Sequence, residues 1–273
     1  MKKNALALPE RALVGSCEIR VLLGQGGGGS CYLAYDRQLE REVVLKEHFP
    51  SSLCMRMPDT AEVLPIDEVA YKHSLSCFCR EARILAGLNH PAVVKVYDIF
   101  RACGTAYMVM EYVAGDSLEQ WLPEHVHDTA AVEDSLVRLL EALEYIHAHD
   151  VLHRDVKPSN IIMRDGQFPV LIDFGAAFLG TPDHTCTLVD YPGFAPPEQF
   201  HPCGEIGPWS DLYALAHTYL AHIPADKMHL YRRQFEQSLL RASQPMKEER
   251  YASAAAWKAH LQQNGGRLFP AVR

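Results

Sequence analysis

Three features are scarce in this 273-residue sequence, and each scarcity excludes a class of protein. No uninterrupted apolar stretch approaches the roughly 18 residues that a membrane-spanning helix needs. Positive charge is in deficit, because 26 Lys and Arg residues stand against 34 Asp and Glu residues, giving a net charge of -8. Proteins that bind nucleic acids or anionic membranes broadly carry a basic excess instead. We therefore expect neither nucleic acid nor membrane among the partners.

Paired cysteine motifs are also missing. The eight cysteines are scattered without a C-x-x-C pair, and the spacing of Cys77 and Cys79 fits neither a zinc site nor a redox motif, so we expect reduced thiols. The apolar run from Ala5 to Leu8 is interrupted by Pro9 and is too short for a signal peptide, so we expect a cytoplasmic protein. With 48% apolar and 22% charged residues, the chain has a globular composition and could form one large domain or two small lobes.

The most informative segment begins at residue 153. Residues 153–160 read H-R-D-V-K-P-S-N, and D-F-G follows at 173–175. A lone H-R-D is as easily a solvated turn, but the spacing from Asp155 to Asn160, followed by Asp173, makes a chance match rare. Two carboxylates and an amide can orient a hydroxyl and hold Mg²⁺ against a nucleotide phosphate. We expect them at adjacent ends of one small sheet, whose strands are the apolar runs 161–163 and 170–172.

A glycine-rich segment follows the first expected strand, residues 17–23. Its pattern is Gly24-x-Gly26-x-x-Gly29, and glycine lets the backbone approach a ligand closely and point N–H groups at phosphate oxygens. The pattern alone is weak evidence, because a dinucleotide-binding fold would place a helix next. Residues 31–35 continue as a strand instead. We therefore expect a hairpin tip over a nucleotide, with these three glycines as binding positions.

A lysine and a glutamate are expected to pair. Residues 43–46 read as a buried strand ending at Lys46, and for a solitary lysine an edge side chain reaching water would be the simpler explanation. Residues 69–88 have helical spacing, however, and Glu81 falls on the apolar stripe of that helix. A carboxylate in such a setting requires a cation. We assign Lys46 as the partner of Glu81, in reach of the α- and β-phosphates of a nucleotide.

Two further regions have an expected role. Segment 49–67, which carries Pro50, Pro58, Asp59 and Pro65, is long for its position and is expected to be a lid or docking surface. Residues 111–115 follow an expected strand, are partly polar and include a glycine. We expect them to be a hinge. Around this hinge, a nucleotide base would meet Met110 and the backbone near Glu111 and Val113. Strands are expected at 93–100 and 106–110, and an amphipathic helix at 130–149.

Taken in order, these motifs and A-P-P-E at residues 195–198 resemble those of eukaryotic-type serine/threonine protein kinases of bacteria, from about residue 17 to about 262. The resemblance implies an α+β, bilobal protein-kinase-like fold. Its N-lobe is an antiparallel β-sheet plus one helix, and its C-lobe is mainly helical with a shortened distal part. It also implies ATP, Mg²⁺ and a protein substrate phosphorylated on Ser or Thr. The expected divisions are a tail 1–16, an N-lobe 17–110, a hinge 111–115, a C-lobe 116–263 and a tail 264–273.

The resemblance also implies roles for individual residues. Asp155 resembles the catalytic base that accepts the proton of the substrate hydroxyl, and Lys157 resembles the residue that contacts the transferred phosphate. Asn160 and Asp173 resemble the metal ligands, and the Lys–Glu pair assigned above resembles the catalytic ion pair of the family. Arg154, next to the base, suggests control by a phosphorylated activation loop, because it would require an anion such as phosphothreonine.

Two residues resemble internal braces of the family, Asp211 and Arg250, the latter pairing with Glu198. Three departures from the family pattern stand beside them. Tyr191 occupies a position that is usually threonine, and the segment between Asp211 and Arg250 is short. Residues 173–198 contain no Lys or Arg. The hydroxyls available there for phosphorylation are Thr181, Thr185 and Thr187.

Three functions are compatible with these observations. The first is an active protein kinase that also phosphorylates itself, since each catalytic position holds the residue type that the mechanism needs. The second is a catalytically silent, nucleotide-binding scaffold, which Tyr191 and the short C-lobe favour. The third is a small-molecule phosphotransferase, which shares the spacing from Asp155 to Asn160 but does not explain Lys157 or the P-P-E brace.

Overall fold

The computed structural model describes residues 7–58, 60–175, 177–179, 193–201 and 204–262. The chain divides into two compact units. One contains the residues before His90 together with Val94–Tyr112, and the other contains His90–Val93 and the chain from Val113 onward. The boundary between Tyr112 and Val113 falls within the segment 111–115 that we expected to be a hinge.

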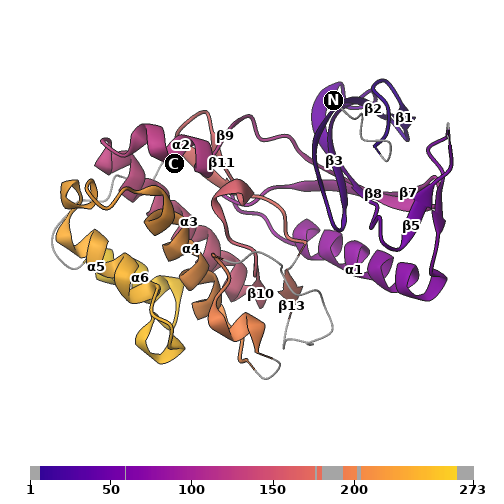
Figure 1. Cartoon of the computed structure of the whole chain (residues 1–273). Coiled ribbons are helices and arrows are strands. Elements are labelled where there is room, and N and C mark those ends of the chain that lie inside the picture. The colour runs from indigo at the N-terminus through magenta and orange to yellow at the C-terminus, as the bar shows by residue number, and fades with distance from the viewer. Residues whose placement is uncertain (1–6, 59, 176, 180–192, 202–203, 263–273) are drawn as a thin grey trace. The chain divides into compact units, whose positions relative to one another are not determined.

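The first unit is built on a six-stranded sheet in which every neighbouring pair is antiparallel (Figure 1). The strand order is β1-β2-β3-β4-β8-β7. The bounds are β1 Leu13–Val14, β2 Cys17–Gly26, β3 Gly29–Asp36, β4 Arg41–His48, β7 Val96–Ala102 and β8 Thr105–Glu111. Alternate residues of these strands point to opposite faces, and one face forms a core that includes Ile19, Ala34, Val43, Leu45 and Val109.

Residues 7–16 differ from the expected N-terminal tail, because they pack on this sheet. Leu8 lies in the core, its backbone N–H donates to the Tyr32 hydroxyl at 3.0 Å, and Val14 of β1 pairs with Cys17 of β2. The sequence contains little sign of this. Leu8 and Val14 are single apolar anchors separated by turn-forming and polar residues, with no strand-like alternation between them.

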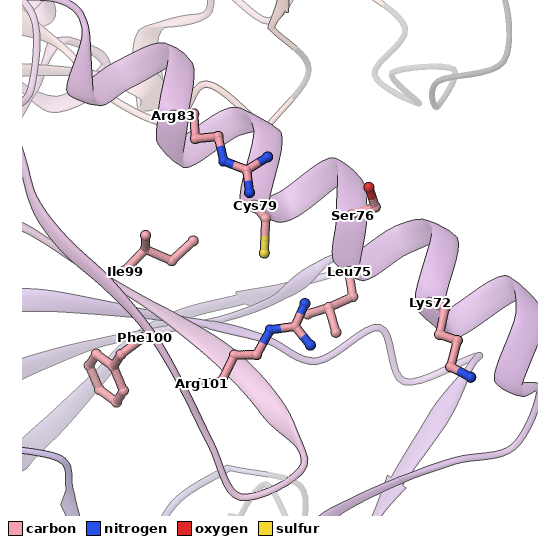
Figure 2. A pocket seen from close by; sticks show the side chains of 8 residues that line it. All are labelled: Lys72, Leu75, Ser76, Cys79, Arg83, Ile99, Phe100 and Arg101. Atoms are coloured by element: carbon pink, nitrogen blue, oxygen red, sulfur yellow. The ribbon is translucent and has the colours of Figure 1, made fainter.

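One helix, α1 (Glu68–Ala86), accompanies the sheet and contacts β7 and β8, with a pocket between α1 and β7 (Figure 2). Asp67 caps it by accepting hydrogen bonds from the N–H groups of Val69 and Ala70, which satisfies two donors of the first turn. The helix buries one apolar stripe and ends at Gly87. The buried side chains of this stripe are Tyr71, Leu75, Phe78, Ala82, Ile84 and Leu85. The expected antiparallel sheet with one helix is confirmed.

Segment 49–67 folds into a small hairpin of β5 (Cys54–Arg56) and β6 (Val63–Pro65). Val63 donates its N–H to the carbonyl of Cys103, and Arg56 reaches the fully buried Glu47 of β4 at 2.7 Å. Tyr32 and Tyr107 also donate hydroxyls to Glu47, at 3.1 and 2.7 Å. Burial and this carboxylate raise the pKa of Tyr32 to about 12, so its hydroxyl stays protonated and can donate. The hairpin is thus fastened to the sheet unit. A role as lid or docking surface stays a prediction.

The second unit is mainly helical, as expected for the C-lobe (Figure 1). Its helices are α2 Leu118–His125, α3 Thr129–Ala148, α4 Pro208–His222, α5 Arg233–Ala242 and α6 Ala254–Gln262, with short 3₁₀ turns at Pro158–Asn160, Pro197–Phe200, Met228–Leu230 and Lys247–Glu249. Its strands are β9 Gly115–Ser117, β10 Val151–Leu152, β11 Ile161–Arg164, β12 Phe168–Leu171 and β13 Phe178–Leu179. Among the residues that the structure describes, no helix has the length and apolar content to cross a membrane.

Candidate active site

The loop 153–160 directs two polar side chains to one carboxylate, that of Asp155. Lys157 Nζ donates to Asp155 Oδ2 at 2.8 Å, and Asn160 Nδ2 donates to the same oxygen at 2.8 Å and to the Asp155 carbonyl at 3.0 Å. The Asp155 side chain is 15% exposed, so a ligand can still reach it. Two donors on one oxygen fix the orientation of the carboxylate. The arrangement suits a group that accepts a proton from a bound hydroxyl.

The buried carboxylate of Asp211, at the start of α4, anchors this loop. It accepts the backbone N–H of His153 at 2.9 Å and that of Arg154 at 2.8 Å, and it pairs with Nε2 of His147 on α3 at 2.8 Å. Burial by itself raises the pKa of Asp211, but the hydrogen bonds outweigh it and the pKa is lowered. The hydrogen bond from the Arg154 N–H to Asp211 stabilises Arg154 at φ 64°. Non-glycine residues adopt this conformation only at a cost in free energy. The expected bracing role of Asp211 is thus explained by geometry.

Sequence reasoning missed one partner of this anchor and one partner of the loop. His147 lies near the C-terminal end of α3, where the pattern indicated only a position near the apolar face, and the short connection to His153 brings both to Asp211. Gln199 donates to the carbonyl of Arg154 at 3.1 Å and joins the segment after residue 193 to the loop. Neither residue belongs to a spaced motif, so only the folded chain reveals them.

His153 connects the loop to the D-F-G segment. Its Nδ1 accepts the backbone N–H of Asp155 at 3.3 Å, and its ring lies 4.4 Å from that of Phe174, centroid to centroid. Both side chains are fully buried. Burial lowers the pKa of His153, so the ring is neutral near pH 7 and can accept that hydrogen bond. The contact explains why an aromatic residue follows Asp173.

Asn160 and Asp173 lie at the same end of the β11–β12 pair. Ile161 and Leu171 are cross-strand partners, and Ile172 donates its N–H to the carbonyl of Asn160 at 2.9 Å. Asp173 adopts φ 58°, and its Oδ1 accepts the N–H of Gly175 at 3.3 Å. The predicted strands 161–163 and 170–172 are confirmed within a residue or two, and Asn160 and Asp173 flank them at one end of the pair. A role of these residues as metal ligands stays a prediction.

In the sheet unit, the predicted ion pair is present. Lys46 Nζ lies 2.8 Å from Glu81 Oε1, and the two side chains are 15% and 7% exposed. Along β4, Lys46 and His48 lie on the face toward α1, and Leu45 and Glu47 point to the other face. The His48 ring packs on Tyr71 and Phe78 of α1, and its Nε2 lies 2.9 Å from the Ser74 hydroxyl. Strand β4 therefore carries both Lys46 and His48, the residue on which α1 packs.

The glycine-rich segment is the predicted hairpin tip between β2 and β3, closed by the pair Gly26 and Gly29. A Cβ atom added at Gly24 or Gly26 would meet nothing within 4 Å, so packing does not require glycine there. At Gly29, with φ 157°, the added atom would lie 1.9 Å from the carbonyl oxygen of Glu47. Gly24 and Gly26 leave room for close approach of a ligand, and Gly29 is required by the fold.

The three expected base-binding positions differ in character. Met110 is buried within β8, where it is the cross-strand partner of Val44 and Val96. The N–H of Glu111 donates to the carbonyl of Lys95 at 2.9 Å and could serve a ligand only by giving up that bond. Val113 begins the stretch assigned to the second unit. Contact of a nucleotide base with these residues stays a prediction.

The second expected brace is also present. Arg250 forms a two-bond pair with Glu198, at 2.7 and 3.0 Å, and the Ser210 hydroxyl donates to the same carboxylate at 2.8 Å. Arg250 is buried, so the pair fixes the P-P-E segment against the start of α4. Tyr191 and the three activation-loop threonines lie outside the described residues.

Comparison with known proteins agrees with this geometry. The model of the protein kinase domain matches residues 17–260. The serine/threonine-protein kinase PknA of Nostoc sp. is 36% identical over 211 residues, which cover 72% of this chain and 35% of that protein. Serine/threonine-protein kinase F of Synechocystis sp. is 32% identical over 284 residues, covering 90% and 54%. The chain thus spans between about a third and about half of the length of these curated relatives.

Solved structures give the same result. The structure described as the PpkA-294 apo form superposes with a TM-score of 0.80 at 29% identity, covering 94% of this chain and 100% of that one. A mutant form of the PknI kinase domain from Mycobacterium tuberculosis superposes with a TM-score of 0.64 at 24% identity, covering 95% of this chain and 100% of that one, which supports the fold alone. With the family model matching nearly the whole chain and the catalytic-loop, D-F-G and Lys–Glu geometry in place, this chain belongs to the protein kinase family.

Proposed function

We propose that the chain transfers the γ-phosphoryl group of ATP to serine or threonine hydroxyls of proteins, its own included. The observation that carries the proposal is the arrangement around Asp155, a partly exposed carboxylate held by Lys157 and Asn160 on a loop anchored to buried Asp211. The two relatives described above, PknA of Nostoc sp. and kinase F of Synechocystis sp., are both named as serine/threonine-protein kinases, which supports this choice of acceptor.

In this proposal, Asp155 orients the acceptor hydroxyl and accepts its proton. The ammonium group of Lys157, already 2.8 Å from Asp155 Oδ2, supplies positive charge beside the place where the acceptor oxygen meets the phosphoryl group. Lys157 also favours a protein kinase over a small-molecule phosphotransferase, since that alternative leaves this lysine without a role.

Asn160 and Asp173 would hold Mg²⁺, which suits oxygen ligands. Within the part of the chain that the structure describes, no group of three or more His, Cys, Asp or Glu side chains is placed to hold a metal. Two protein oxygens fit an ion whose remaining ligands are phosphate oxygens and water. When bound, the Mg²⁺–ATP complex supplies an activated phosphoryl group.

Lys46, paired with Glu81, would contact the nucleotide phosphates, and Gly24 and Gly26 would allow the backbone of the hairpin tip to approach them. The proposal therefore requires that Lys46 of the sheet unit and Asp173 of the helical unit engage one nucleotide. We place this activity in the cytoplasm, because the described cysteines at 17, 31, 54, 77, 79 and 103 are free thiols, as in a reducing compartment.

The test compares wild-type protein with Asp155→Asn, using radioactive ATP and Mg²⁺ and a generic basic protein as acceptor. Loss of the base should lower the rate of labelling by about 10² to 10⁴. The stabilisation of each protein by ATP and Mg²⁺ in a thermal unfolding experiment serves as the control for nucleotide binding. Equal labelling of the two proteins would refute the role of Asp155. Stabilisation without any labelling would show a silent scaffold, and labelling of small alcohols alone would show a small-molecule phosphotransferase.

A further inference from the structure

Gln199 connects the segment 193–201 to the loop that carries Asp155. It lies in the 3₁₀ turn Pro197–Phe200, and its side-chain Nε2 donates to the carbonyl oxygen of Arg154 at 3.1 Å. Gln199 and Arg154 are 45 positions apart, and both belong to the helical unit. Gln199 is half-buried. The contact is therefore a tertiary one, made by a side chain that is partly shielded from water.

The carbonyl that accepts this hydrogen bond belongs to the peptide group preceding the Cα atom of Asp155. The Arg154 carbonyl and the Asp155 N–H lie in one rigid plane. Gln199 holds the oxygen side of this plane, and His153 Nδ1 accepts the N–H on the other side at 3.3 Å. A plane held at both sides restricts how the chain enters the Cα atom of Asp155. Because the carboxylate extends from that atom, Gln199 acts on the orientation of the base.

Arg154 is also the strained residue of the loop, with φ 64°. A strained conformation persists only where the surrounding structure determines it. Asp211 accepts the N–H of Arg154 at 2.8 Å, and Gln199 donates to its carbonyl, so both backbone polar groups of the strained residue are held by side chains. Removal of the Gln199 amide would withdraw one of these two constraints.

Gln199 is itself held on a fixed backbone. Its N–H donates to the carbonyl of Pro196 at 3.0 Å. The preceding residue, Glu198, accepts two hydrogen bonds from buried Arg250 at 2.7 and 3.0 Å and one from the Ser210 hydroxyl at 2.8 Å. A side chain on such a support presents its donor in a defined place, as a positioning group must.

We propose that Gln199 is a positioning residue for phosphoryl transfer. Its side-chain amide acts through the peptide group between Arg154 and Asp155 and keeps the Asp155 carboxylate directed at the acceptor hydroxyl. The inference rests on the proposed function, because it uses the role assigned there to Asp155. Misplacement of a catalytic group lowers the rate of the chemical step, and Gln199 is not among the residues assigned to the nucleotide. Its loss should therefore lower kcat and leave the KM for ATP nearly unchanged.

The experiment measures kcat and the KM for ATP with a generic basic protein as acceptor. The proteins are wild type, Gln199→Leu, Gln199→Glu and Gln237→Leu. Gln199→Glu keeps the size of the side chain but removes the donor, and Gln237, exposed on α5, is the matched control for the change to leucine. Both variants at position 199 should lose about tenfold in kcat, with a KM for ATP within about twofold of wild type. The control should match wild type in both constants.

Hydrogen exchange provides a second measurement that does not require activity. The amide of Asp155 belongs to the peptide group that Gln199 holds, so a fragment containing residues 154–157 should exchange about tenfold faster in Gln199→Leu than in wild type. A fragment from α6 should exchange equally in all four proteins. Mass spectrometry of the fragments measures both rates.

The outcomes separate this inference from the proposed function. A kcat that is unchanged in both variants at position 199, a loss in the leucine variant alone, or a raised KM for ATP with unchanged kcat would each overturn the inference. Loop exchange equal to that of wild type would also overturn it. If wild type itself transfers no phosphate, the proposed function fails, and the exchange rate alone then decides whether Gln199 positions the loop. Thermal unfolding verifies that the variants are folded, and Gln199→Glu carries the test if the leucine variant is not.

Discussion

In the helical unit, Asp155, Lys157 and Asn160 come from one short loop, whereas in the sheet unit Lys46 and Glu81 are 35 positions apart and belong to a strand and a helix. The loop is held by two backbone hydrogen bonds to the buried carboxylate of Asp211. The Lys46–Glu81 pair is held by the packing of α1 on His48 of β4. The first arrangement is therefore fixed locally, whereas the second depends on how well α1 stays in place.

The largest effect is expected from removing the anchor of the loop. Asp211→Ala would leave two buried N–H groups and His147 without their acceptor, and should lower the free energy of unfolding by about 3–5 kcal/mol. Urea unfolding measures the change, and phosphoryl transfer should disappear with it. Asp226→Ala, at a side chain that is 75% exposed, is the control. A loss below about 1 kcal/mol would mean that the loop holds its shape without this anchor.

The next effect is a loss of stability at low pH, and it involves His48, the β4 residue on which α1 packs. Burial lowers the pKa of His48 to about 4, so the folded chain keeps this ring neutral while the unfolded chain protonates it below about pH 6.5. Stability should therefore fall as the pH drops from 6.5 toward 4, by about 3 kcal/mol from this residue. His153 acts in the same direction, because burial lowers its pKa as well.

The pH effect is measured by urea unfolding at several pH values on wild type and His48→Gln. The substitution should flatten the dependence without removing it, and the exposed His73→Gln on α1 should leave it unchanged. A slope that is identical in wild type and His48→Gln would show that the ring does not stay neutral in the folded chain.

Two glycines of the hairpin tip should respond differently to the same substitution. Gly29→Ala places a methyl group against the Glu47 carbonyl and should cost about 2 kcal/mol or more of folding free energy. Gly26→Ala meets no neighbour and should change stability by less than about 0.5 kcal/mol, but it should raise KM for ATP. Thermal unfolding and ATP titrations of the two variants decide the matter. Comparable destabilisation by both would contradict the distinction.

A coupling energy smaller than the cost of Gly29→Ala is expected at the Lys–Glu pair. A double-mutant cycle with Lys46→Met and Glu81→Gln should give a coupling energy of about 1–2 kcal/mol, since both side chains are largely buried but retain some contact with water. Each single variant should lose phosphoryl transfer far beyond its loss of stability. If the coupling is zero while transfer persists, the two residues act independently.

The sequence predicted most of the proposed site because its motifs combine fixed spacing with short strands. The spacing from Asp155 to Asn160 and the strand after it determine their geometry almost alone, and Glu81 on an apolar helix face required a cation, for which Lys46 was the candidate. What the sequence did not predict involves contacts between distant segments. His147, Gln199 and the packing of Leu8 belong to no local pattern, because their partners are set by tertiary folding.

The hairpin of β5 and β6 has a consequence for how such a chain can change over time. Its Arg56 supplies the only cation that the described residues offer to Glu47, a carboxylate with no exposed surface on the strand that carries Lys46. Trimming the hairpin to a short turn would leave that charge uncompensated in the interior. The β5–β6 hairpin and Glu47 should therefore be gained or lost together in evolution. A related chain that lacks the hairpin should carry a neutral residue in place of Glu47.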